Sequence, residues 1–346
     1  MIKYLLSILL LVLSFDIKAQ ELIWSVNLEK IKKIDSLKDK GLLVGINSID
    51  FLDNNIFFIT GARDLSLRTF DVQEKSQILN LQDEYKLIID YDISYDKSKI
   101  LILGPKTNKA KYEINIYNLQ NGNIIQSFKT KLKFYGHHGF AKFENKDNNI
   151  IVYGGLKGRK NIVTKLNTQN GHKNDIFKLR DYKYFYNLNI SENYDIAFFT
   201  FEGNQFYFCK TPVESINKSN IKYFGNTIWA YKHGIINNNK FYLSTDQYIY
   251  YGNSMKDIDH ITTGYKIEYI STVKNYFITN DDQNNIYIIN SINKKIIKLI
   301  DLSKYADEIY GPFAINEDFS QLVVSTFDDG YLKLMVFDIS DLNTEI

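Results

Sequence analysis

The residues Asn118-Leu119-Gln120-Asn121-Gly122 follow an alternating apolar run and precede another one. The stretch Asn167-Thr168-Gln169-Asn170-Gly171 repeats this pattern, and weaker copies cover Asp71 to Lys75, Asn290 to Lys294 and Asp338 to Leu342. Asn and Gly adopt positive φ angles easily, which tight turns between antiparallel strands require. The pattern therefore predicts repeated pairs of antiparallel strands, each pair joined by a short turn.

These turns belong to a unit that recurs about seven times. A polar turn such as Asp96-Lys97-Ser98 joins the first strand of a unit to the second. The third strands are expected to end at intervals of 39 to 49 residues, near Phe70, Tyr117, Leu166, Phe208, Tyr250, Ile289 and Phe337. Units of four antiparallel strands at this period predict an all-β fold of the β-propeller type.

Seven units predict a ring of seven four-stranded blades, because one blade must stack against its neighbours to bury both faces. Six or eight blades are the alternatives, since the fourth unit is irregular and the fifth is short. The blades are expected at residues 42–82, 87–130, 134–180, 184–223, 228–261, 265–301 and 311–346, the last of them completed by residues 22–27.

The two ends of the chain predict how the ring closes. The last unit has no room for a fourth strand before Ile346, whereas Leu22 to Val26 is an apolar strand outside any unit. We expect this segment to supply the outer strand of the last blade, which would remove two sheet edges. Apolar residues at helical spacing indicate a short surface helix before the first blade: Leu28, Ile31, Ile34 and Leu37.

Residues 1–19 have the pattern of a secretory signal peptide. Lys3 precedes an apolar run from Tyr4 to Phe15, and the small residue Ala19 follows two charges. The run is shorter than the roughly 20 apolar residues of a membrane-spanning helix. We expect cleavage after Ala19 and a single domain, residues 20–346, that is periplasmic or secreted from a bacterial cell. An uncleaved anchor is the alternative.

Composition narrows the classes of function. The formal net charge is +2, and removing Lys3, Lys18 and Asp16 with the leader lowers it to +1. This balance does not favour nucleic acid or an anionic membrane as a partner. Cys209 is the only cysteine, so no internal disulfide can form. Stability must come from burial, and the 26 Tyr and 23 Phe residues suit strands that pack on both faces.

The turn after the third strand, best seen in Ile116 to Gly122, resembles the repeat of WD40-like and YVTN-like seven-bladed β-propellers of bacteria. The resemblance covers nearly all of the chain after the leader and implies the fold only, with no family active site carried over. Neither Trp24 nor Trp229 is followed by Asp, as a WD40 repeat would have it. The kelch-type pair Gly154-Gly155 occurs once, and Ser325 to Gly330 departs from the Asp-box of sialidases at Phe327.

Few residues are candidates for catalysis. Asp90-Tyr91-Asp92 is the one place where two carboxylates share a strand face, and His138 is the third member of this catalytic alternative. His137 and His138 are adjacent in a strand and point to opposite faces, so both cannot easily bind one metal ion. No Gly-x-Ser-x-Gly or Walker-type loop is present. The sequence therefore predicts no metal site and no cofactor.

In a propeller, the loops between second and third strands share one end of the ring with the loops that lead into the first strands. Basic residues are expected there on blades two and three, and acidic residues across the ring on blades six and seven: Lys106, Lys109, Lys157, Arg159, Lys160, Asp281 and Asp328. Such a field could orient a peptide. Four aromatic residues could line the same mouth: Tyr184, Trp229, Tyr231 and Tyr265. Solvated loops and packing between blades are the alternative interpretation.

These patterns favour an exported, monomeric, non-catalytic β-propeller that binds a protein or peptide on its charged, tyrosine-rich end. The first alternative is a propeller-type hydrolase or lyase that acts on a sugar, lactone or peptide in the central funnel. A subunit of an envelope complex, with the propeller as its platform, is the second alternative.

Overall fold

The structure is a computed structural model of the 346-residue chain. It describes residues 21–30, 46–61, 67–81, 84–85, 88–106, 112–130, 139–144, 146–156, 160–179, 184–190, 195–202, 205–212, 221–226, 232–236, 240–244, 246–254, 257–328 and 331–341. The expected leader, residues 1–19, lies outside the described residues, as do three of the four residues of the expected surface helix.

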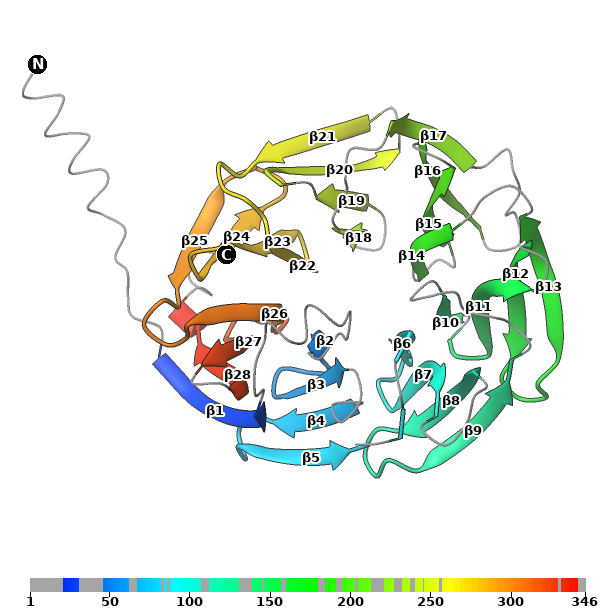
Figure 1. The fold of residues 1–346 in the computed structure, drawn as a ribbon, viewed down its shortest axis with the longest axis horizontal. Coiled ribbons are helices and arrows are strands. Elements are labelled where there is room, and N and C mark those ends of the chain that lie inside the picture. Colours follow the sequence, from blue (N-terminus) through cyan, green and yellow to red (C-terminus); the bar gives the residue numbers. More distant parts are fainter. Residues whose placement is uncertain are drawn as a thin grey trace, which may run out of the picture.

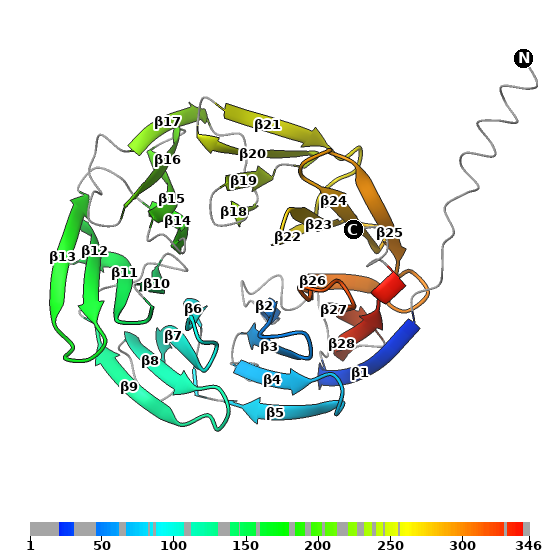
Figure 2. The same cartoon turned by 180° about the vertical axis from the view of Figure 1, so that it is seen from behind.

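The described residues form seven four-stranded antiparallel sheets, arranged as the blades of a ring (Figures 1 and 2). Blade one contains β2 (Ile46–Phe51), β3 (Ile56–Gly61), β4 (Leu67–Asp71) and β5 (Ser76–Asn80). Blade two contains β6 (Asp90–Ile93), β7 (Lys99–Pro105), β8 (Tyr112–Asn118) and β9 (Ile124–Lys129). Blade three contains β10 (Phe140–Glu144), β11 (Asn149–Leu156), β12 (Lys160–Asn167) and β13 (Lys173–Leu179).

The next three blades repeat this order. Blade four contains β14 (Tyr184–Ile190), β15 (Asp195–Glu202), β16 (Gln205–Pro212) and β17 (Ile221–Asn226). Blade five contains β18 (Lys232–Ile236), β19 (Lys240–Ser244), β20 (Tyr248–Ser254) and β21 (Asp257–Thr262). Blade six contains β22 (Tyr269–Val273), β23 (Tyr276–Asn280), β24 (Asn285–Asn290) and β25 (Ile296–Asp301).

Blade seven joins the two ends of the described chain. Its strands are β26 (Glu308–Ile315), β27 (Gln321–Asp328) and β28 (Tyr331–Asp338), and β1 (Glu21–Lys30) is its outer strand. β1 pairs antiparallel with β28 from Glu21 opposite Asp338 to Lys30 opposite Tyr331. The sequence predicted this closure. It also placed Leu28 in a helix, which is wrong, because strand pairing continues past Leu28 to Lys30.

The core lies between neighbouring blades, because successive side chains of a strand point to opposite faces. In β7, Ile100 and Ile102 pack toward blade one, whereas Leu101 and Leu103 pack toward blade three, and all four are fully buried. The first strand of each blade is innermost and the fourth is outermost (Figure 1). The axis is therefore lined by β2, β6, β10, β14, β18, β22 and β26.

The repeated turn follows from its first and last residues. Asn118 accepts hydrogen bonds at Oδ1 from the backbone N–H groups of Gln120 (2.8 Å) and Asn121 (3.2 Å). The last residue, Gly122, has a φ of 70°, in the region that glycine enters without steric cost. Within the described residues, the structure has no helix with the length and apolarity of a membrane span.

Candidate functional site

Polar residues from three inner strands meet near the axis of the ring. Asp50 comes from β2, Asp90 and Asp92 come from β6, and Lys142 comes from β10. Asp90 and Asp92 lie two residues apart, so their side chains project from the same face of β6. Tyr91, between them, points the other way, toward Asp50. One short strand therefore serves both of its neighbours.

The two carboxylates of β6 are bonded to β10. Asp90 accepts at Oδ1 from the Lys142 ammonium (2.8 Å) and at Oδ2 from the backbone N–H of Ala141 (2.9 Å). Asp92 accepts at Oδ2 from the backbone N–H of Phe143 (2.7 Å). β10 is the inner edge of its sheet, where such N–H groups have no strand partner. The carboxylates supply the missing acceptors and connect blade two to blade three.

Burial changes the proton affinity of these groups. Burial raises the pKa of Asp90 and raises that of Asp92 to about 6, while the Lys142 ammonium opposes both shifts. Burial also lowers the pKa of Lys142, but the carboxylates of Asp90 and Asp92 outweigh it, so the net shift is upward. Lys142 therefore stays charged at neutral pH and forms a charge-assisted hydrogen bond with Asp90.

Asp50 has a different environment. Its Oδ2 accepts a hydrogen bond from the Tyr91 hydroxyl, and among the described residues no ammonium or guanidinium lies within ion-pair distance of it. The Asp50 side chain is open to the pocket, yet protein on several sides separates it from bulk solvent. This burial raises the pKa of Asp50 to about 6. Asp50 is thus an accessible carboxylate without an ion-pair partner among the described residues, although the more distant Lys142 ammonium partly offsets the rise in its pKa.

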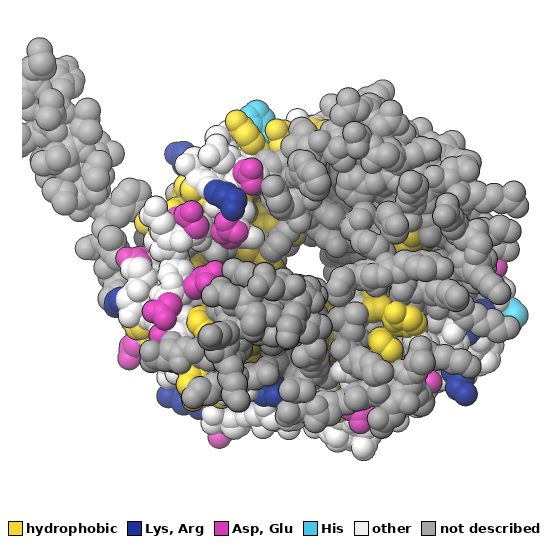
Figure 3. Space-filling model, in the orientation of Figure 1, with side chains coloured by type: hydrophobic (Ala, Val, Ile, Leu, Met, Phe, Trp, Pro, Cys, Tyr) yellow, Lys and Arg dark blue, Asp and Glu magenta, His cyan; other side chains and the backbone are white. Residues whose placement is uncertain are grey.

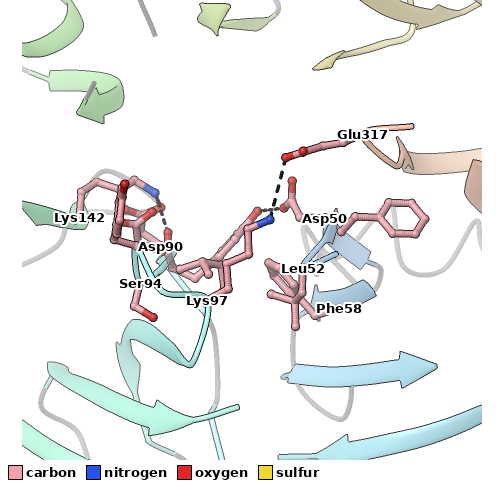
Figure 4. Close-up of a pocket in the computed structure, with 13 residues that line it drawn as sticks. Asp50, Leu52, Phe58, Asp90, Ser94, Lys97, Lys142 and Glu317 are labelled. Atoms are coloured by element: carbon pink, nitrogen blue, oxygen red, sulfur yellow. Dashed lines mark hydrogen bonds and ion pairs between the residues drawn. The ribbon is translucent and has the colours of Figure 1, made fainter. Parts of the chain in front are cut away.

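Two pockets meet at Asp50. The first, of about 560 Å³, includes Asp92, Tyr95 and Lys142 in its lining (Figure 4). The second, of about 440 Å³, extends along β22 and includes Ser271. Asp50, Phe51 and Glu317 line both pockets.

The pockets open at the end of the ring where turns join first strands to second strands, which we call the pocket end. Leu52, Lys97, Lys274 and Glu317 belong to these turns and line one or both pockets. Lys97 Nζ lies 3.9 Å from Glu317 Oε1, so this ion pair connects blade two to blade seven past Asp50 (Figure 4). Both side chains are largely exposed, which makes the pair weak.

The opposite end, which we call the charged end, carries the described ones of the residues that the sequence selected for binding: Lys106, Tyr265, Asp281 and Asp328. Figure 3 shows acidic side chains gathered over the part of the ring that β22 to β26 occupy, beside a central opening. Asp281 accepts hydrogen bonds from Asn285 Nδ2 (2.9 Å) and from the Tyr287 hydroxyl (2.7 Å). Tyr265 stacks on Tyr287 with 3.8 Å between ring centroids. These contacts all lie within blade six and the loop that leads into it.

Two other described residues that the sequence selected at the charged end also have partners. Lys106 pairs with Glu84 at 3.1 Å, and Asp328 pairs with Lys333 of the next strand. The structure does not describe the side chains of the remaining predicted residues. Six of them lie outside the described residues: Lys109, His138, Lys157, Arg159, Trp229 and Tyr231. Lys160 lies in β12 and Tyr184 in β14, but their side chains are not described.

Sequence reasoning missed Lys142 and did not select Asp50 or Glu317 as site residues. Within Phe140 to Glu144, Lys142 is the single basic residue in an apolar strand, which is a weak signal by itself. Three of the hydrogen bonds between β6 and β10 join residues 51 positions apart in the sequence. If blades two and three are aligned with this offset, Lys142 lies opposite Tyr91. Among the residues that the structure describes, no group of three or more His, Cys, Asp or Glu could hold a metal ion.

No protein-family model matches the chain, and no curated protein matches it in sequence. The fold is similar to a crystal structure of the Cps50 (Swd1) β-propeller domain from Myceliophteria thermophila, with a TM-score of 0.64. The match covers 92% of this chain and 99% of that chain at 8% sequence identity. At this identity the likeness shows the fold alone, and the predicted WD40-like β-propeller fold is confirmed.

Proposed function

We propose that the protein is an exported, monomeric, non-catalytic β-propeller that binds a protein or peptide partner at one end of its ring. The pattern of residues 1–19 supports export. The closed ring of blades supports the role of a rigid binding platform. A rigid platform loses little conformational entropy when a partner binds.

One observation carries the preference for binding over catalysis. Asp90 and Asp92, the only carboxylate pair that the sequence offered for catalysis, accept backbone N–H groups of β10, and Asp90 also accepts from Lys142. These bonds give both residues a structural role between blades. A general acid or base must instead reach the reacting group of a substrate.

The pocket end is the better docking surface among the described parts of the ring. Lys106 and Asp328 at the charged end pair with neighbours in the chain, whereas the pocket end has two cavities and the accessible carboxylate of Asp50. The sequence predicts Lys157, Arg159 and Lys160 at the charged end, which is the other surface that a partner could use.

The test is capture of partners by the purified protein from its own envelope extract, identified by mass spectrometry. The wild type is compared with a pocket-end variant, Asp50→Asn with Glu317→Gln, and a charged-end variant, Lys157→Glu with Arg159→Glu and Lys160→Glu. We expect a partner that the pocket-end variant loses while its melting temperature is unchanged. Loss from the charged-end variant alone would move the site to that end, and no partner at all would contradict the binding function.

A hydrolase or lyase acting on a sugar, lactone or peptide is the second candidate. The observation in its favour is that burial raises the pKa of Asp50 and of Asp92 to about 6, which suits a general acid near neutral pH. Turnover of any substrate of these classes, lost from a folded Asp92→Asn or Asp50→Asn variant, would establish this candidate and displace the first.

A further inference from the structure

The first pocket contains more negative than positive side chains. Its lining includes four carboxylates, those of Asp50, Asp90, Asp92 and Glu317, and two ammonium groups, those of Lys97 and Lys142. Lys142 pairs with Asp90 at 2.8 Å, and its charge also acts on Asp92 and Asp50. Lys97 reaches Glu317 only at 3.9 Å, in an exposed ion pair. The lining of the pocket therefore has excess negative charge, which an additional cation would balance.

The Asp50 carboxylate, which has no ion-pair partner among the described residues, lies beside apolar side chains. Asp50 is next to Phe51, which lines both pockets, and the buried Phe58 lines the first. Lys and Arg side chains are apolar along the stem and charged at the tip, so they match a site that has both kinds of surface. A carboxylate accepts ammonium or guanidinium donors in strong, charge-assisted hydrogen bonds.

The second pocket contains a hydroxyl that is not satisfied within the described residues. Ser271 lines this pocket, and its Oγ atom is shielded from water without a hydrogen-bond partner there. A buried hydroxyl without a partner is unfavourable, and a serine side chain can rotate between staggered positions. Ser271 can thus turn toward a donor that enters the second pocket beside Asp50.

We propose that Asp50, with Glu317 across the pocket mouth, forms a subsite that binds one basic side chain, lysine or arginine, of the protein or peptide partner. This inference rests on the proposed binding function and names the chemistry of the partner. In the free protein, Lys97 forms an ion pair with Glu317 and therefore competes with the incoming cation for that carboxylate. The two residues therefore have opposite effects: removing the Asp50 charge weakens binding, and removing the Lys97 charge strengthens it.

The experiment is calorimetric titration of residues 20–346 at pH 7.5 and low salt. The probe is the capped pentapeptide acetyl-Gly-Ser-Arg-Ser-Gly-amide, and its matched control carries citrulline, which has the shape of arginine without its charge. We expect the arginine peptide to bind about tenfold more tightly than the citrulline peptide. This ratio of affinities corresponds to the free energy of about one charge-assisted hydrogen bond. Equal affinities, or no binding of the arginine peptide, would overturn the proposal.

Three variants test the residues. Asp50→Asn is expected to weaken binding of the arginine peptide about tenfold, and Lys97→Met is expected to strengthen it about threefold. Asp282→Asn is the matched control, because it removes the same charge from an exposed turn between β23 and β24 at the charged end. It should leave the affinity unchanged. Circular dichroism and melting temperatures verify that the variants fold, and an unchanged affinity in folded Asp50→Asn would refute the subsite.

Two further results separate this proposal from the proposed function. An envelope partner that binds wild type and Asp50→Asn equally would remove the subsite and leave the binding function intact. Free spermidine serves as the probe for a small amine. If spermidine binds through Asp50 more tightly than the arginine peptide, the ligand is a small polyamine and the proposal of a partner side chain is wrong.

Discussion

At the scale of single residues, β6 shows how one strand can hold two neighbouring blades. Its carboxylates face β10 and accept two N–H groups that are also two residues apart, Ala141 and Phe143. Its tyrosine faces β2 and donates to Asp50. The alternation of a strand thus turns a three-residue sequence, Asp90-Tyr91-Asp92, into contacts with the blades on both sides.

The Lys142–Asp90 ion pair gives the first prediction. Replacing Lys142 by Met leaves the largely buried Asp90 carboxylate with backbone donors alone. We expect a loss of about 2–3 kcal/mol in the free energy of unfolding, below the usual cost for a fully buried pair because both side chains keep some contact with water. Adding Asp90→Asn should recover part of this loss. Urea unfolding of the two single variants and the double variant measures the coupling, and strictly additive losses would contradict it.

Asp92 gives a prediction about pH. Burial raises its pKa from 3.8 to about 6, so the folded protein holds this proton more tightly than the unfolded chain. This contribution to stability is complete below about pH 4 and is lost as the pH rises to about 6. Asp92→Asn keeps an acceptor for Phe143 and cannot titrate. We expect the variant to lose less stability than the wild type between pH 4 and pH 7, as measured by urea unfolding. Parallel pH profiles would show that Asp92 does not titrate as described.

At the scale of elements, the repeated turn is the unit that the sequence encodes most clearly. In the copies that begin at Asn118 and Asn167, glycine takes the final, left-handed position, with a φ of 70° in both. In the copies that begin at Asp71 and Asn290, the same position holds Lys75 and Lys294, with φ angles of 51° and 61°. Residues with a Cβ atom are disfavoured in this region by roughly 1 kcal/mol.

This difference predicts opposite effects of exchanging the final residue. Lys294→Gly should stabilise the protein by up to about 1 kcal/mol, and Gly171→Ala should destabilise it by a similar amount. Gly122→Ala should cost more than Gly171→Ala, because its new Cβ would lie 2.5 Å from Leu79 Cδ1, whereas the one at Gly171 would lie 3.8 Å from Phe128. Urea unfolding ranks the three variants. An equal loss of stability in Gly122→Ala and Gly171→Ala would mean that the Leu79 side chain moves aside without a loss of free energy.

The strands and their order could be predicted because their signals are local. Turn residues and apolar runs lie within a few positions of one another, as in Ile116 to Gly122. The expected helix over Leu28 was wrong because a periodic apolar pattern competes with the free edge of β28, which lies far away in the sequence. Lys142 was missed for a related reason, since its importance depends on the register between two blades.

In the whole molecule, the pocket end is formed by residues of several blades and cannot be predicted from any one repeat. Asp50, Lys97 and Glu317 belong to blades one, two and seven, and only closure of the ring brings them to one pocket. A repeat read alone contains none of this geometry. The sequence placed charged loops at one end, and the cavities that the structure describes lie at the other.

Ring closure itself rests on β1. Trp24 of β1 packs against Phe70 of blade one, with 5.9 Å between ring centroids, and Leu22 packs against the cluster shared by blades six and seven. β1 therefore contributes to the cores on both sides of blade seven, and it also covers the edge of β28. Losing this strand would expose apolar surface and a row of unpaired backbone groups at once.

Deletion of residues 20–30 tests this role, with the chain that begins at residue 20 as the control. We expect the melting temperature to fall by about 10 °C or more, because closure energy and apolar burial are lost together. The free edge of β28 should also pair with a second copy, so light scattering should detect dimers or larger species that the control lacks. The pocket end lies beside blade seven, so the truncated protein should also bind the arginine peptide less tightly. A truncated chain that melts like the control and keeps its size would mean that blade seven holds the ring with three strands.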